Sequence, residues 1–330
     1  MTRRTILLNM LFAVSPFAGR LARFTRIASA LAADQHDEPP PAGRKALIEF
    51  GWDEPDTAFL RKHQAEVEQS PFDGCVFHVN TGGGGKPPEN FAWLAWGRRR
   101  FAEADFTDAV ADLRAIAWKR FHHNFLRLNV TPGDVDWFDD HDAILENARL
   151  AARLAREGRC RGILLDTEQY QGPLFNFRKQ KPADGRGWKE YAGQARRRGR
   201  EGMEAFQAEY PGLTVFLTFG PSLLWKQSRE GRIPLADCEY GLLVPFIEGM
   251  IESAGGENRI IDGFESSYSF QKAEQFAAAH ETMTVHVPGL LSHPNDYRRV
   301  VSPGFGIWLD YEWPKRGWNT DDLEQNYFSP

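Results

Sequence analysis

Short apolar runs alternate with longer helical patterns from residue 45 onward, and this alternation restricts the fold more than any other feature of the sequence. Eight runs have the length and the content of β-branched and aromatic residues that are typical of buried strands. They lie at residues 45–51, 74–80, 124–130, 162–168, 213–219, 259–265, 283–289 and 305–311. Because strand and helix alternate eight times, the pattern predicts an α/β fold, a single (β/α)8 TIM barrel over residues 45–330.

The clearest helical pattern covers residues 139–158, where an acidic first turn precedes apolar residues at helical spacing and Gly158 supplies a stop. Residues 240–256 are apolar enough for a strand, but a helix there keeps the number of strands at eight. The alternative architecture is an open doubly wound sheet. That fold usually has a glycine-rich phosphate turn after its first strand, and residues 51–57 read GWDEPDT, without a GxGxxG motif.

The N-terminus has the features of an export signal. Arg3 and Arg4 precede an apolar stretch, and Ala30-Leu31-Ala32 matches an A-x-A cleavage site, so residues 1–33 resemble a twin-arginine signal. Residues 34–44, which contain three consecutive prolines, read as a linker. The alternatives are an amphipathic N-terminal helix and a misplaced start codon. We expect an exported protein, periplasmic or extracellular, with no stable membrane span after signal removal.

Charge and cysteine content narrow the classes of partner. The net charge is −5 and the pI is near 6.0, so there is no broad basic field and we expect no nucleic-acid partner. Cys75, Cys160 and Cys238 include no CxxC pair, which favours buried free thiols over a metal or disulfide role. We expect neither a metal nor another cofactor, and the sequence leaves the oligomeric state open.

Polar residues replace apolar ones near the end of almost every predicted strand. They are Glu49, His78, Asn80, Arg127, Asn129, Asp166, Glu168, Thr218, Glu265, Tyr268, His286, Trp308 and Asp310. Barrel enzymes carry their active sites on inward-facing positions at the carboxyl ends of the strands. The alternative is that strand ends are polar because they meet water. The presence of two acids on one strand favours a shared site.

Asp166 and Glu168 are two residues apart, so they leave the same side of the predicted strand. Paired carboxylates suit glycoside hydrolysis, in which one group gives a proton to the leaving oxygen and the other is ionised. The neighbouring Asp166 anion favours the protonated form of Glu168. Glu265 is the better candidate for the second carboxylate, and Asp310 is the other.

The segment GILLDTE (162–168) resembles the strand-four motif DGxDxDxE of the family 18 chitinase-like hydrolases. Gly162, Asp166 and Glu168 match that motif, whereas Arg161 and Leu164 replace its first two acids. The last predicted strand is similar to that family's final strand, with Trp308 in the place of its inward tryptophan. The resemblance, taken to the wider group of barrel glycoside hydrolases, implies that Glu168 is the acid/base and that Asp166 orients the substrate.

The sequence thus predicts a glycoside hydrolase that cleaves a poly- or oligosaccharide. The expected catalytic residues are Glu168, Glu265 and Asp166. The expected substrate-binding residues are Glu49, His78, Asn80, Arg127, Asn129, Tyr170, Tyr268, His286, Trp308 and Asp310.

Two other functions are open. One is a metal-dependent hydrolase, whose suspected ligands are His78, Asp166, His286 and Asp310. The other is a carbohydrate-binding barrel without catalysis. A glycine-rich stretch, NTGGGGKPP (80–88), could cradle an anion, but prolines follow its lysine and a loop over the pocket is the favoured interpretation.

Overall fold

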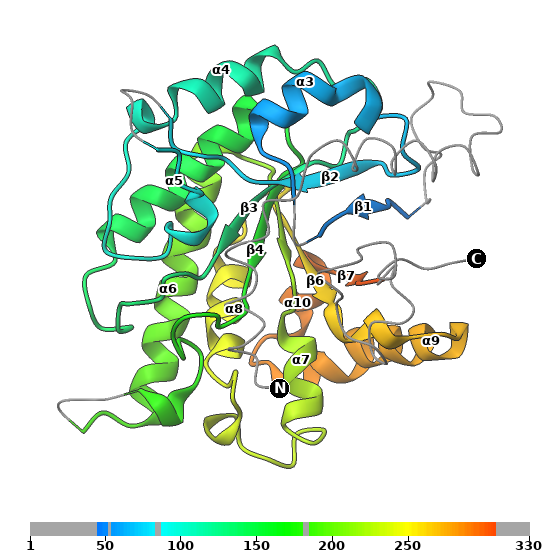
Figure 1. Cartoon of the computed structure of the whole chain (residues 1–330). Helices are drawn as coiled ribbons and strands as arrows, with labels where there is room; N and C mark the ends of the chain where they lie inside the picture. Colours follow the sequence, from blue (N-terminus) through cyan, green and yellow to red (C-terminus); the bar gives the residue numbers. More distant parts are fainter. Residues whose placement is uncertain (1–44, 52–53, 83–86, 181–184, 308–330) are drawn as a thin grey trace, which may run out of the picture.

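Seven parallel strands form one curled sheet in a computed structural model that describes residues 45–51, 54–82, 87–180 and 185–307 (Figure 1). The strands follow one another in chain order across the sheet, and each pairs in parallel with the next. They are β1 (Ile48–Glu49), β2 (Gly74–Phe77), β3 (Phe125–Asn129), β4 (Gly162–Asp166), β5 (Thr214–Leu217), β6 (Arg259–Phe264) and β7 (Val301–Phe305). Parallel neighbours joined by helices are the expected result of repeated βα units.

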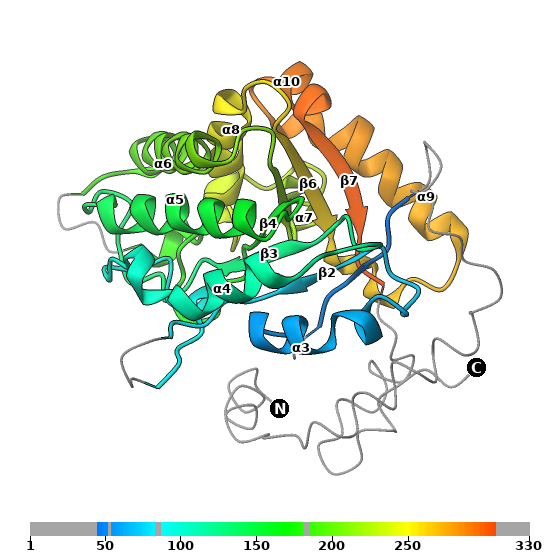
Figure 2. The ribbon, with the colours of Figure 1, turned by 90° about the horizontal axis from the view of Figure 1, so that it is seen from above.

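Helices surround the outside of the sheet, as the view from above shows (Figure 2). The α-helices are α3 (Thr57–Val67), α4 (Thr107–Ala115), α5 (Asp142–Glu157), α6 (Trp188–Glu209), α7 (Pro221–Gln227), α8 (Leu243–Ser253), α9 (Ala273–Glu281) and α10 (Pro294–Val300). Short 3-10 turns are η1 (Phe91–Trp93), η2 (Glu103–Asp105), η3 (Phe177–Lys179), η4 (Leu235–Asp237), η5 (Glu265–Ser269) and η7 (Val287–Leu290), and η6 (Thr282–His286) is a π-helical turn. The helices predicted over 139–158 and 240–256 are confirmed as α5 and α8.

The predicted strand at 283–289 is wrong, because these residues form η6 and η7. Met283 and Val287 are buried while Val285 is 57% exposed. The buried residues are four positions apart, as on one face of a helix. In so short a run the apolar residues also fit the alternation of a strand, which explains the wrong prediction. The seventh strand is instead β7, which reads VSPGF. Pro303 and Gly304 concealed it, because both residue types are depleted in strands.

The described part of the chain is a seven-stranded, half-barrel-like α/β fold, and it contains no eighth strand paired with β1 or β7. Several predictions fall outside the described residues. They concern the signal (1–33), the linker (34–44), and the remainder of the predicted eighth strand with Trp308 and Asp310. Within the described ranges, no helix combines the length and apolar character needed to cross a lipid bilayer.

The apolar side chains form two clusters, one on each face of the sheet. The small cluster on the concave face contains Val76, Phe125 and Leu164, with Phe50 and Phe216 packed against it. The large cluster fills the space between the sheet and the helices and includes Cys75, Cys160 and Cys238, which are buried free thiols as predicted. Side chains alternate along a strand, so every second residue after a member of the concave cluster also points to the concave face, up to the carboxyl end of its strand.

Candidate active site at the carboxyl ends of the strands

Strand alternation carries polar side chains from several strands to the concave face. On β3, Arg127 and Asn129 lie on the same face as Phe125, and on β4, Asp166 lies on the same face as Leu164. Asn129 and Asp166 are direct neighbours in the parallel register of β3 and β4. The first residues of each strand therefore fill the core, and the last ones form a polar layer above it.

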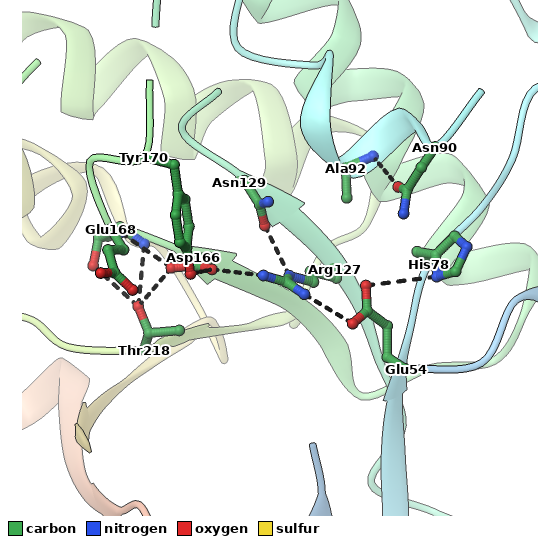
Figure 3. A network of polar contacts seen from close by, with 11 residues as sticks. Glu54, His78, Asn90, Ala92, Arg127, Asn129, Asp166, Glu168, Tyr170 and Thr218 are labelled. Carbon is green, nitrogen blue, oxygen red and sulfur yellow. Dashed lines mark hydrogen bonds and ion pairs between the residues drawn. The ribbon is translucent and has the colours of Figure 1, made fainter. Parts of the chain in front are cut away.

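Arg127 lies at the centre of this layer and is 5% exposed (Figure 3). Its Nε donates to Asn129 Oδ1, its Nη1 to Glu54 Oε2 and its Nη2 to Asp166 Oδ2, each at 2.8 Å. Burial acts to lower the pKa of Arg127, but Glu54 and Asp166 outweigh burial and raise the pKa above its ordinary value. The guanidinium is a permanent cation that is paired on both sides by buried carboxylates.

Asp166 ends β4 with both carboxylate oxygens fully engaged. Oδ2 accepts from Arg127 Nη2 at 2.8 Å and from the Tyr170 hydroxyl at 3.0 Å. Oδ1 accepts from the Glu168 backbone N–H at 3.0 Å and from Thr218 Oγ1 at 3.2 Å. A carboxylate accepts about four hydrogen bonds, so this side chain has no remaining capacity and acts as a positioning residue. Four hydrogen bonds from the protein suit a role in positioning neighbouring residues better than a direct chemical step, whereas the resemblance implied that Asp166 orients the substrate.

Glu54 and His78 extend the layer toward β1 and β2. Glu54 Oε1 lies 3.5 Å from His78 Nδ1, and both side chains are largely buried. Burial raises the pKa of Glu54, although Arg127 opposes this, and burial lowers the pKa of His78 to about 4. His78 is therefore neutral at pH 7. Neighbouring Asn80 donates to Asp56 at 3.1 Å, and Asp56 also caps the first turn of α3.

Glu168 follows Asp166 on the same face and is half-buried. The Tyr170 phenol, which donates to Asp166, has its pKa raised strongly by burial and further by Asp166 and a hydrogen bond with Glu168. Trp93 from η1 packs edge-on against the Tyr170 ring at 5.0 Å between centroids. Glu168 is thus oriented through its backbone by Asp166 and sits beside an aromatic wall.

Glu265 and Tyr268 approach the same region from η5, directly after β6. Burial raises the pKa of Tyr268 strongly, and the carboxylates of Glu265, Asp166 and Glu168 raise it further, with a hydrogen bond to Glu265 among the causes. Glu265 and Tyr268 therefore lie at the same carboxyl edge of the sheet as Asp166 and Glu168, with β5 between β4 and β6. Gly306 allows this placement, because a Cβ there would lie within 2.2 Å of the Tyr268 ring.

Two predicted binding residues lie elsewhere. Glu49 alternates with Ile48 and Phe50, which pack on the concave cluster, so its side chain leaves the opposite face of β1. His286 belongs to η6 and stacks on Trp225 at 5.2 Å between centroids, because the strand on which it was placed does not exist. Both findings correct the set of substrate-binding residues that the sequence predicted.

Sequence reasoning also missed residues that the structure brings into the layer. Glu54 lies beyond the predicted first strand (45–51), so the pattern of polar strand ends did not include it. Phe50 and Trp93 cover the Arg127 guanidinium, with their ring centroids 5.2 Å and 5.4 Å from Cζ. Trp93 is one of four tryptophans in the connections, with Trp96, Trp137 and Trp188, that the sequence suggests could line subsites, and the sequence does not separate it from the other three.

Among the described residues, no group of three or more His, Cys, Asp or Glu side chains is arranged to hold a metal ion. Comparison with known proteins gives no relative: no family model, curated protein or solved structure matches this chain.

Proposed function

We propose that this protein is a glycoside hydrolase that acts on a poly- or oligosaccharide. The observation that carries the proposal is that Asp166 and Glu168 at the end of β4 and Glu265 after β6 lie at the same carboxyl edge of the parallel sheet. In most glycoside hydrolases, two carboxyl groups that flank the scissile bond share the proton transfer and the stabilisation of the developing positive charge. In this proposal Glu168 donates the proton, Glu265 is the second carboxylate, and Asp166 positions Glu168.

The surroundings of the acids support a sugar ligand. Trp93 and Tyr170 meet at 60° beside Glu168, and both rings are half-buried, so part of each remains accessible. Aromatic faces stack on sugar rings, and the carboxylate and amide groups nearby can bind hydroxyl groups. The proposal includes a closed eight-stranded barrel and export directed by residues 1–33.

The test is reducing-sugar release from a broad panel of polysaccharides. Wild type, Glu168→Gln and Glu204→Gln are compared, the last being an exposed glutamate on α6 that undergoes the same chemical change. We expect release by wild type and Glu204→Gln, and a loss of about 10²–10⁴-fold in Glu168→Gln, since a general acid contributes that much. Equal release by wild type and Glu168→Gln would remove Glu168 from the proposed mechanism.

A carbohydrate-binding barrel without catalysis is the second candidate, and it is favoured by the complete engagement of Asp166 by four donors. Binding measurements separate the two functions. A hydrolase loses turnover in Glu168→Gln but retains affinity, whereas a binding protein shows no turnover in either form.

A further inference from the structure

The charge of Arg127, the cation of the polar layer, is already paired within the protein. Each nitrogen of Arg127 donates to a different acceptor, and Phe50 and Trp93 pack against the guanidinium. A carboxylate or sulfate on a ligand would have to compete with Glu54 and Asp166 for this guanidinium. An arginine in this state balances internal charge and does not recognise an anionic ligand.

The charge that remains around the site is negative. Arg127 is compensated by Glu54 and Asp166, while Glu168 after β4 and Glu265 after β6 add further carboxyl groups. These carboxyl groups lie at the same carboxyl edge of the sheet, on either side of β5. A ligand with its own negative charge would be repelled there.

Asn129 offers the layer a neutral donor. The side chain is fully buried, and its Oδ1 accepts from Arg127 Nε at 2.8 Å. Its Nδ2 has no hydrogen-bond partner among the residues that the structure describes, although buried polar groups are normally paired. The register places Asn129 beside Asp166 on the concave face, and Figure 3 shows its nitrogen turned away from the Arg127 contact. An amide N–H in this position requires an acceptor oxygen.

We propose that the site binds a sugar unit that carries no anionic group, and that Asn129 Nδ2 donates to one of its oxygens, directly or through one ordered water. Uronate and sulfated units are excluded by the negative field and by the occupied arginine. The inference rests on the proposed carbohydrate function and adds the class of sugar and a residue that selects it. It does not depend on which carboxyl group acts as the acid.

The first experiment compares two derivatives of each panel polysaccharide that is soluble in both forms. Hydroxyethyl and carboxymethyl substituents are similar in size, so they differ mainly in charge. Binding to Glu168→Gln, which avoids turnover, is followed by tryptophan fluorescence at low and high salt. We expect the carboxymethyl form to bind about tenfold or more weakly, with a smaller difference at high salt because ions screen the repulsion.

The outcomes separate this inference from the proposed function. Equal or tighter binding of the carboxymethyl form would overturn the inference and leave a carbohydrate function standing. Binding of neither derivative, together with no sugar release in the panel, would contradict the proposed function and remove the inference with it.

The second experiment tests Asn129 itself. Asn129→Asp keeps an oxygen acceptor for Arg127 Nε but removes the donor, so we expect the thermal midpoint to be retained while neutral-ligand affinity falls about tenfold. Asn295→Asp on α10 is the control, because it makes the same change at an exposed position. Unchanged affinity in Asn129→Asp would contradict the assignment. If that variant fails to fold, Asn129→Ser is measured instead and the same loss of affinity is expected.

Discussion

The Arg127 side chain determines how the other polar residues of the concave face are arranged. It joins the segment before α3 to β4 through Glu54 and Asp166, and it fixes Asn129 on its own strand. Buried charges are tolerated only when they are paired, so these residues depend on one another for their positions. Asp166 in turn accepts hydrogen bonds from the Glu168 backbone N–H and the Tyr170 hydroxyl, which helps to position both residues.

The buried His78 gives the protein a specific pH dependence. Burial lowers the pKa of His78 from 6.5 to about 4, so between these values the unfolded chain binds a proton that the folded protein does not. Stability is therefore lost as the pH falls through this window, by about 3 kcal/mol at most. We expect the unfolding free energy from urea titrations to fall more steeply from pH 7 to pH 4 in wild type than in His78→Gln.

The control for this measurement is His122→Gln, at an exposed histidine before β3. It should retain the steep pH dependence of wild type. Parallel curves for wild type and His78→Gln would show that the buried histidine does not account for the effect.

The close packing of α6 against α8 follows from the lengths of neighbouring elements. Only seven residues form α7 after β5, so α8 serves as the crossover to β6 and packs beside α6. Gly199 and Gly249 permit the close approach, because a Cβ at either position would lie 1.8 Å from a backbone oxygen of the other helix. These contacts make the helix pair sensitive to a single added methyl group.

Two alanine substitutions on α6 should therefore have opposite effects. Gly199→Ala forces the helices apart and should destabilise the protein by about 1–3 kcal/mol. Gly193→Ala is the matched control, because a Cβ there meets nothing within 4 Å, and it should stabilise the helix by about 0.5–1 kcal/mol. Chemical denaturation of both variants tests this difference, and equal effects of the two substitutions would contradict the packing account.

Prediction from the sequence succeeded for elements whose local pattern was long. The periodicity of α5 and the apolar content of α8 identified both helices, and six strands were placed correctly. It failed at 283–289, where a short apolar run fits either period, and at β7, where Pro303 and Gly304 are poor strand residues. Tertiary packing decides such segments, because their local preferences are weak.

At the scale of the whole molecule, alternation along parallel strands explains most of the candidate site. Arg127, Asn129 and Asp166 could be predicted because they continue the concave face of strands that were correctly located. The position of His286 could not, because it depended on a strand that is absent from the described part of the chain. Loop-borne groups such as Trp93 reach the site through chain paths that no local pattern encodes.

Glu168 after β4 and Glu265 after β6 are proposed to act as one catalytic pair, and this is the central claim. The most direct measurement is the turnover of wild type, Glu168→Gln, Glu265→Gln and the double variant on a polysaccharide that wild type cleaves. Residues that act as a unit are strongly non-additive, so each single variant should lose most turnover and the double variant should lose little more. Near-wild-type turnover in Glu265→Gln, or losses that multiply in the double variant, would contradict the account.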